Sequence, residues 1–180
     1  GLQNEPVKIS TEDKIEWIHL LNKTGLSYIE VTSFVRPDWI PQLSDALEVM
    51  QKINRKKDIT YAALVPNMRG LERALSVNVD EVSVFMSASE THNKKNINKT
   101  ISETFPVLAE VVSEAVKEKK RVRGYISTVF ICPYEGKIAP EQVLQVTERL
   151  FEMGVAEISL GDTIGAAVPT QVEELLEQLL

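Results

Sequence analysis

Short segments rich in β-branched residues alternate with helical patterns along this chain, and that order leaves few folds open. The predicted strands are Tyr28–Ser33, Ile59–Val65, Glu81–Ser87, Arg121–Thr128 and Glu157–Leu160. Each gap between them is long enough to hold a helix. Parallel strands need such crossover connections, whereas antiparallel strands can be joined by tight turns. The sequence therefore predicts repeated βα units and a parallel sheet.

Helical patterns occupy the gaps between the predicted strands. Ser10 is placed to cap a first helix, with Ile15, Ile18 and Leu21 on its apolar face, and Gly25 closes it. Further helices are predicted at Leu43–Ile53, in a short stretch after Gly70, at Ile101–Lys119 and at Pro140–Met153. The segment 92–98, which follows the third predicted strand, is expected to be a loop.

One face of these strands is polar, and this separates two α/β architectures. In a doubly wound sheet the central strands are covered on both faces, so they read as nearly continuous apolar runs. Here Glu30 and Thr32 alternate with apolar neighbours, and Arg123, Tyr125 and Ser127 do so in a later strand. Helices outside and a polar interior are typical of a (β/α)₈ TIM barrel, which is the fold class we predict.

The length of the chain allows only part of such a barrel. Eight βα units take about 250 residues, and this chain has 180. We therefore expect a partial barrel of about five to six βα units that forms a single domain over residues 1–180. The sequence does not start with Met, and its apolar period runs to Leu179 and Leu180 without a helix stop signal. We expect an excerpt of a longer protein, without the first strand and the last two.

The composition argues against several classes of protein. No apolar run reaches the roughly 18 residues of a membrane span, and no secretory leader opens the sequence. A net charge of −6 argues against binding to nucleic acid. One cysteine forms neither an internal disulfide nor a cysteine-rich zinc site. We expect a cytoplasmic protein with no membrane and no nucleic-acid partner.

Glu30 is the most informative candidate for chemistry. The active site of a barrel is built at the carboxyl ends of its strands, and every predicted strand end here is polar, which suggests a polar substrate and a metal. Because Ile29 and Val31 face outward, the Glu30 carboxylate is expected to point into the barrel. A carboxylate there needs a metal, another cation or a basic side chain. A structural ion pair with Arg123 is the alternative.

Asp162 is the second candidate, and it lies between glycines in the segment Gly161–Gly165. Glycines permit a sharp turn, which directs the carboxylate toward the mouth of the barrel. The alternative is a local role, in which Asp162 forms an Asx turn or caps a helix near Pro169. The residues themselves leave both roles open.

The other candidates each have a functional and a structural interpretation. Cys132 is either an exposed nucleophile or an inert buried thiol, and His92 is either a base or ligand or an ordinary loop residue. Lys94 and Lys95 lie near the mouth, where they either receive a phosphate-bearing ligand such as a nucleotide or CoA, or form a solvated loop. The sequence contains no P-loop, no Gly-x-Ser-x-Gly elbow and no His-Glu-x-x-His motif, so most catalytic templates are excluded.

Five segments together resemble the 3-hydroxy-3-methylglutaryl-CoA lyase family, in order and at the expected spacing. They are Gly1–Glu5, Gly25–Val35, Lys94–Asn98, Cys132–Gly136 and Ser159–Gly165. The resemblance covers essentially the whole chain. The family belongs to a wider group of metal-dependent TIM-barrel lyases and Claisen-type synthases.

The resemblance implies cleavage of an acyl-CoA substrate, 3-hydroxy-3-methylglutaryl-CoA, to acetoacetate and acetyl-CoA. It also implies a divalent cation, Mg²⁺ or Mn²⁺, which would stabilise the developing oxyanions, a homodimer, and a place in leucine and ketone-body metabolism. By position, Glu30 matches the family's glutamate beside the metal, and Asp162 matches its aspartate of proton transfer. The substrate-binding positions of the mouth and the CoA entrance are matched by Gln3, Ser33, Asn67, Lys94, Lys95, Asn96 and Ser159.

The family's direct metal ligands fall outside residues 1–180. Its Arg-Asp pair precedes Gly1, and its His-x-His pair and its Gly-rich loop with the catalytic cysteine lie beyond Leu180, so Cys132 is not that cysteine. We therefore expect no direct metal ligand in this stretch and no activity of the stretch alone. A related condensing synthase of the isopropylmalate or homocitrate type, and a noncatalytic fragment that binds CoA or pairs subunits, stay open as alternatives. A mitochondrial location stays open as well.

Overall fold

The fold is built on one parallel sheet. The computed structural model describes residues 2–180, so Gly1, which opens the first matched segment, lies outside the described residues. The sheet has the order β1-β2-β3-β4-β7, and every neighbouring pair is parallel, as predicted. Its strands are β1 (Tyr28–Ser33), β2 (Thr60–Leu64), β3 (Glu81–Ser87), β4 (Arg121–Ser127) and β7 (Glu157–Leu160).

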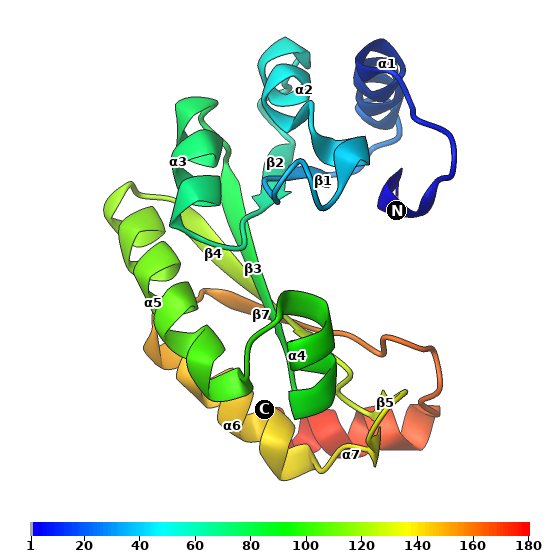
Figure 1. The fold of residues 1–180 in the computed structure, drawn as a ribbon, viewed down its shortest axis with the longest axis vertical. Coiled ribbons are helices and arrows are strands. Elements are labelled where there is room, and N and C mark those ends of the chain that lie inside the picture. The colour runs from blue at the N-terminus through cyan, green and yellow to red at the C-terminus, as the bar shows by residue number, and fades with distance from the viewer. Residues whose placement is uncertain (1) are drawn as a thin grey trace.

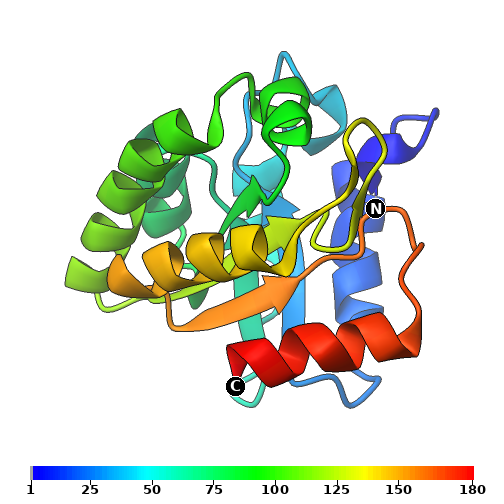
Figure 2. The ribbon, with the colours of Figure 1, turned by 90° about the horizontal axis from the view of Figure 1, so that it is seen from below.

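Helices alternate with these strands, and most of them cover one face of the sheet (Figure 1). They are α1 (Thr11–Leu21), α2 (Ala46–Lys52), α3 (Met68–Ser76), α4 (Glu90–Ile97), α5 (Ile101–Lys117), α6 (Pro140–Glu152) and α7 (Pro169–Leu179). Two 3₁₀ turns are η1 (Leu2–Asn4) and η2 (Pro41–Leu43). Figure 2 shows α5 and α6 lying outside the sheet. The fold is a partial (β/α) barrel, as predicted.

The covered face of the sheet forms the hydrophobic core. In β4, Val122 and Ile126 are buried, whereas Arg123 and Tyr125 lie on the other face and are half-buried. Helix α5 packs its apolar stripe against β3 and β4. The residues of this stripe are Phe105, Leu108, Val111, Val112 and Ala115. The polar face predicted from the strand pattern is therefore confirmed, and it lines the inside of the arc.

Residues 90–97 form helix α4, so the loop predicted for residues 92–98 was wrong over most of its length. The Ser89 hydroxyl accepts the N–H of His92 at 3.1 Å and caps the helix. Asn98 ends the helix in the left-handed conformation, with φ 55°. The buried Asn93 side chain donates hydrogen bonds to the Lys99 carbonyl and the Thr104 hydroxyl. These tertiary contacts stabilise a helix that has little apolar period of its own.

Smaller differences concern element boundaries. Helix α3 begins at Met68, before Gly70, because the Asn67 side chain accepts the N–H of Gly70 at 3.0 Å. Helix α2 begins at Ala46, after the separate turn η2, and α1 ends at Leu21, before Gly25. A short antiparallel hairpin of β5 (Ile131–Cys132) and β6 (Gly136–Lys137) was not predicted. In residues 2–180, no helix has both the length and the apolar character needed to cross a membrane.

Gly70 allows α3 to lie against the segment that follows β1. A Cβ at Gly70 would lie 2.9 Å from the Phe34 carbonyl oxygen and 3.2 Å from the ring of Pro66. Backbone and a proline ring cannot move aside as a flexible side chain can. This close approach fixes the loop after β1 against the start of α3.

Gly70→Ala is expected to lower the free energy of unfolding by about 1–2 kcal/mol, because overpacking outweighs alanine's better helix propensity. Urea titration of the protein that carries this sequence measures the change. Glu72→Ala is the matched control, since Glu72 is exposed on the same helix and its substitution should shift stability by less than about 0.5 kcal/mol. Equal stability of Gly70→Ala and wild type would contradict the argument.

Candidate active site

A network of charged side chains lies on the inner face of the sheet. The Arg123 guanidinium pairs with Glu81, with Nε 3.0 Å from Oε1, and with Glu157, with Nη1 2.9 Å from Oε1. Arg121 pairs with Glu157 at 2.8 Å, and the Tyr28 hydroxyl donates to Glu81 at 2.9 Å. The Glu81 side chain is only 3% exposed. Its charge is tolerated there because both arginines and the tyrosine surround it.

Glu30 lies on the same inner face as Tyr28, but it is exposed and takes no part in this network. The alternative ion pair with Arg123 is not formed, because Arg123 is occupied by Glu81 and Glu157. Burial, together with the charge of Glu30 and a hydrogen bond to it, raises the pKa of Tyr125 to about 12. The Tyr125 hydroxyl therefore stays protonated at neutral pH and donates a hydrogen bond to the Glu30 carboxylate.

Hydroxyl groups tie the carboxyl ends of β3, β4 and β7 together. The hydroxyls of Ser87 and Thr128 are 2.6 Å apart, and the N–H of Thr128 donates to the Thr163 hydroxyl at 2.7 Å. The Asn93 side chain accepts the N–H of Ser87 at 2.9 Å. Ser87 and Thr128 are buried. These bonds fix the relative positions of three strand ends, which a site built on those ends requires.

Thr128 is held in an unusual backbone conformation, with φ 55°. A β-branched residue rarely adopts the left-handed region. The hydrogen bonds of its hydroxyl and its N–H hold it there. Backbone strain of this kind concentrates at functional sites, so it marks the end of β4 as part of the candidate site.

Asp162 follows β7, and its carboxylate is engaged with its own loop. It accepts the N–H of Ala166 at 3.2 Å and that of Ala167 at 2.9 Å. Gly165 has φ 65°, which permits the turn that brings these groups back to Asp162. Asp162 therefore has a local structural role, but it is neither the Asx turn nor the helix cap offered as the alternative, because its donors lie four and five residues on and Val168 is the N-cap of α7. Asp162 is nevertheless half-buried at the strand end, beside Gly161.

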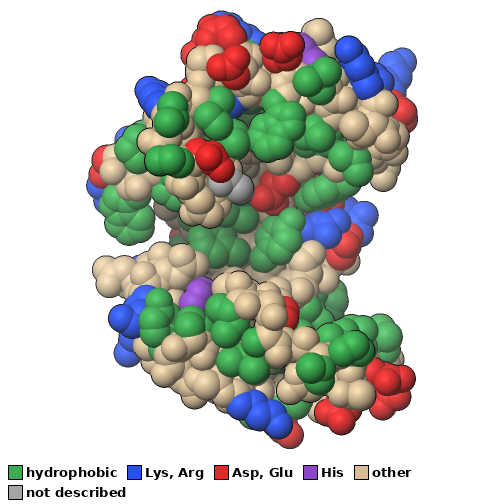
Figure 3. All heavy atoms as spheres, turned by 90° about the vertical axis from the view of Figure 1, so that its right-hand side faces the viewer, with side chains coloured by type: hydrophobic (Ala, Val, Ile, Leu, Met, Phe, Trp, Pro, Cys, Tyr) green, Lys and Arg blue, Asp and Glu red, His purple; other side chains and the backbone are tan. Residues whose placement is uncertain are grey.

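The proposed mouth residues belong to different strand ends. The Ser33 hydroxyl, at the end of β1, is buried and forms no hydrogen bond within residues 2–180. Asn67 lies after β2 and caps α3. The Ser159 hydroxyl in β7 accepts a hydrogen bond from Arg123 at 3.1 Å, and Gln3 is exposed in η1. The face of the molecule drawn in Figure 3 is hollowed between its upper and lower parts.

Lys94, Lys95 and Asn96 are exposed on α4, at the same end of the sheet. The Lys95 ammonium lies 4.8 Å from the centroid of the Tyr134 ring in the adjacent β5–β6 hairpin. Cys132 in that hairpin is only 1% exposed, and its sulfur accepts a hydrogen bond from the Ser89 hydroxyl at 3.0 Å. The exposed-nucleophile interpretation of Cys132 was therefore wrong, and the buried-thiol interpretation is confirmed.

The described residues do not fit a complete metal site. Within residues 2–180, no three His, Cys, Asp or Glu side chains are grouped closely enough to hold an ion. Glu30 is bonded to Tyr125, and both oxygens of Asp162 accept backbone N–H groups. This part of the chain does not by itself form a site for the cation that the resemblance implies.

The family profile described as HMGL-like matches residues 1–180, the whole length of this chain. The chain belongs to the HMGL-like family. It is 61% identical over 180 residues to the hydroxymethylglutaryl-CoA lyase YngG of Bacillus subtilis, covering 100% of this chain and 60% of that protein. The predicted family resemblance is therefore confirmed.

Solved structures agree with this assignment to the HMGL-like family. The crystal structure of the Bacillus subtilis HMG-CoA lyase is similar with a TM-score of 0.97 at 61% identity, over 99% of this chain and 60% of that one. An HMG-CoA lyase of A. baumannii, in complex with coenzyme A and 3-methylmalate, has a TM-score of 0.96 at 40% identity, over 100% of this chain and 59% of that one. The chain thus spans about 60% of the length of these HMGL-like relatives.

Sequence reasoning missed two features of this HMGL-like site. It placed Tyr125 on the polar face but did not pair it with Glu30, because β1 and β4 are separated by two strands in the sheet and local sequence does not show that their side chains meet. It also missed Thr128, since nothing in the local sequence indicates a left-handed threonine. Thr128 was instead predicted as the last residue of the strand Arg121–Thr128, whereas the observed strand ends at Ser127.

His92 is expected to make the free energy of unfolding of this HMGL-like chain depend on pH. Its Nδ1 atom is buried and has no hydrogen-bond partner among the described residues, and burial lowers its pKa below the usual value. On acidification the unfolded chain takes up the proton first, near the ordinary pKa of about 6.5. Stability is therefore expected to fall as the pH drops below that value toward the folded-state pKa.

His92→Gln is expected to remove this dependence. The measurement is the free energy of unfolding from urea titrations at pH 7.5 and at lower pH, for wild type and variant in parallel. His19→Gln is the control, because it removes the other histidine of the chain. The assignment fails if wild type and His92→Gln lose stability equally on acidification.

Proposed function

We propose that the protein carrying this sequence is a hydroxymethylglutaryl-CoA lyase, which cleaves 3-hydroxy-3-methylglutaryl-CoA to acetoacetate and acetyl-CoA. The observation that carries the proposal is 61% identity over all 180 residues to a curated enzyme of that name. The A. baumannii enzyme solved with coenzyme A and 3-methylmalate supports an acyl-CoA substrate. The polar inner face of the sheet and the polar strand ends suit such a ligand.

In this proposal Glu30 and Asp162 are the catalytic carboxylates of this part of the protein. Glu30 places a negative charge at the open side of the inner face, where the Tyr125 hydroxyl orients it. Asp162 is held at the end of β7 by two backbone N–H groups, which fixes the direction of its carboxylate for proton transfer. Substrate binding is assigned to Gln3, Ser33, Asn67, Lys94, Lys95, Asn96 and Ser159.

The proposal includes a divalent cation, Mg²⁺ or Mn²⁺, which would supply Lewis-acid stabilisation of oxyanions. The described residues do not provide the ligand set of this cation. The resemblance further supports a homodimer and a role in leucine degradation and ketone-body metabolism. We place the protein in the cytoplasm, as some relatives are named cytoplasmic, although others are named mitochondrial. We also propose that residues 1–180 belong to one domain.

The test is an assay of the purified protein that carries this sequence, with 3-hydroxy-3-methylglutaryl-CoA as substrate, with and without Mg²⁺. Acetoacetate and acetyl-CoA should appear in equal amounts and only with the cation. Consumption of acetyl-CoA together with an oxo acid would instead show a condensing synthase. If acetyl-CoA is neither released nor consumed and the intact mass is 20.2 kDa, the result supports a noncatalytic chain.

A further inference from the structure

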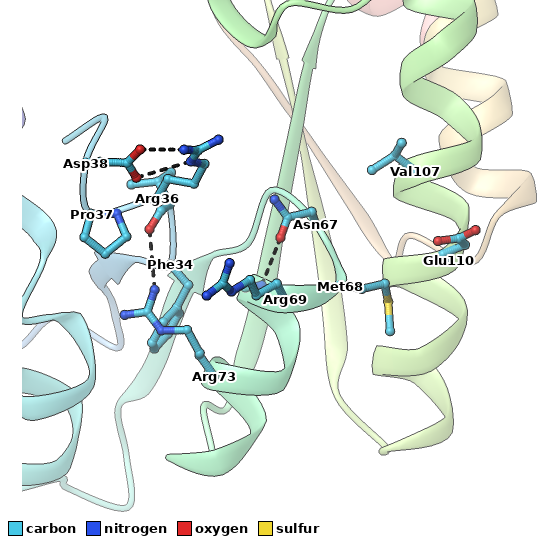
Figure 4. Close-up of a pocket in the computed structure, with 12 residues that line it drawn as sticks. Phe34, Arg36, Pro37, Asp38, Asn67, Met68, Arg69, Arg73, Val107 and Glu110 are labelled. Carbon is cyan, nitrogen blue, oxygen red and sulfur yellow. Dashed lines mark hydrogen bonds and ion pairs between the residues drawn. The ribbon is translucent and has the colours of Figure 1, made fainter.

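A cavity lies beyond the carboxyl ends of β1 and β2, between the segment after β1, the start of α3 and the middle of α5 (Figure 4). Its volume is about 680 Å³. Three arginines from two different elements line it, namely Arg36, Arg69 and Arg73. Of the residues that the proposed function uses, only Asn67 borders this cavity.

The walls of this cavity carry more positive than negative charge. The carboxylates among the lining residues are those of Asp38, next to Arg36, and Glu110, on α5 across the cavity. Arg36 pairs with Asp38 through its Nε and Nη2 atoms, as Figure 4 shows. Arg69 forms no hydrogen bond within residues 2–180, although the charge of Asp38 acts on it. One positive charge is thus left without a matching carboxylate.

The position of the Arg69 charge on α3 is unfavourable when no anion is bound. Arg69 and Arg73 are four residues apart on one helix, so they share a face and repel each other. Arg69 also lies in the first turn, which holds no acidic residue. Cations at that end interact unfavourably with the helix dipole. An anion bound between the two guanidinium groups would offset both effects.

Two of the three arginines, Arg36 and Arg73, are held in place by aromatic rings. The Arg73 guanidinium carbon lies 5.3 Å from the centroid of Phe34, and its Nη1 donates to the Val35 carbonyl at 3.5 Å. The Arg36 guanidinium lies 5.1 Å from the ring of Trp39. Stacking restricts these long side chains before a ligand arrives, which reduces the entropy lost on binding.

The remaining wall is apolar. Phe34, Val35, Pro37, Met68 and Val107 provide it. Guanidinium groups bind carboxylates through two parallel hydrogen bonds, while an apolar wall favours burial of hydrocarbon. The cavity therefore combines a recognition element for one carboxylate with a surface for a short hydrocarbon chain.

We propose that this cavity is a binding site for a small organic anion, a carboxylate joined to a short apolar chain. Arg69 and Arg73 hold the carboxylate, and the apolar wall contacts the chain. The site shares Asn67 alone with the residues assigned to the acyl-CoA site, and it does not depend on the proposed function.

Trp39 reports on this site, because it stacks with Arg36 at the cavity wall. Residues 1–180 contain two tryptophans, so a Trp17→Phe background leaves Trp39 as the single tryptophan of this stretch, and a Trp39→Phe variant identifies its share of the emission. Hexanoate added to the protein that carries this sequence should change the Trp39 emission in a saturable way. Hexanol, which lacks the charge, and inorganic phosphate, which lacks the chain, should each bind at least about 10-fold more weakly.

Arg69→Gln is expected to raise the Kd for hexanoate by about 10-fold or more, because a hydrogen bond between charged groups is lost. Arg69 is exposed, so the fold should survive, and a urea titration verifies that. Lys23→Gln is the matched control. It removes one exposed positive charge from the turn after α1, away from the cavity, and should leave the Kd unchanged.

Three results would overturn the proposal. They are the absence of a saturable response to hexanoate, an unchanged Kd in Arg69→Gln, and displacement of hexanoate by coenzyme A, which would make the cavity part of the acyl-CoA site. The acetoacetate assay is independent of this titration. Failure of the anion site therefore leaves the proposed lyase activity untouched, and the reverse also holds.

Discussion

Glu30→Gln is expected to lower kcat for acetoacetate release by about 10²- to 10³-fold, which is the effect of removing one positioned acid–base or electrostatic group. Glutamine keeps the size of the side chain and loses only the charge. Glu30 is exposed on the inner face, so the substitution removes no packing. The free energy of unfolding should therefore change by less than about 0.5 kcal/mol.

Glu157→Gln is the matched control for this experiment. Glu157 also carries its carboxylate on the inner face, but it is engaged with Arg121 and Arg123 at the amino-terminal end of β7. Its loss should change kcat by less than about 3-fold, because the active site of a barrel lies at the opposite ends of the strands. Equal losses in the two variants would show that the charge of the whole face matters and that Glu30 has no particular role.

Glu81→Gln is expected to cost about 3 kcal/mol of stability, because it removes the buried charge that pairs with the half-buried Arg123. Glu81 is 2% exposed and is contacted by Tyr28, Arg121 and Arg123. Arg123 would retain Glu157 alone. Glutamine can still accept one hydrogen bond, which keeps the loss below that of a full deletion.

Urea titration measures this effect, and Glu157→Gln again serves as the control. The Glu157 side chain is 38% exposed, so solvent screens its pairs and their loss should cost at most about 1 kcal/mol. The difference between two carboxylates of the same network isolates the effect of burial. If both variants lost the same stability, the network would have to be more solvated than the structure shows.

The order of elements was predictable because it depends on local patterns. In β1, β3 and β4, β-branched residues recur with a period of two, and each long helix has an apolar stripe with a period of 3.6. All five strands of the parallel sheet were predicted within one or two residues of their observed bounds. The polar inner face was predictable for the same reason, since alternate residues of a strand point to opposite faces.

Helix α4 shows where local patterns fail. Its sequence is rich in asparagine and lysine, and it has little apolar period. The helix forms because Ser89 caps it and because the Asn93 side chain bonds to Ser87, Lys99 and Thr104. Ser87 lies in β3, Thr104 lies in α5 and Lys99 lies in the connection between α4 and α5, so the bonds of Asn93 link α4 to both flanking elements.

Some features of the candidate site could also be predicted from the sequence, and others could not. The sequence by itself determined the family, the parallel βα order and the residue types at the strand ends, because these follow from local composition and motif spacing. Only the tertiary structure decided the partners: Arg123 bonds to Glu81 and Glu157, Tyr125 bonds to Glu30, and Asp162 is engaged with its own loop. Sheet order and strand register bring together residues dozens of positions apart, and no local pattern encodes which of several carboxylates lies nearest to a given arginine.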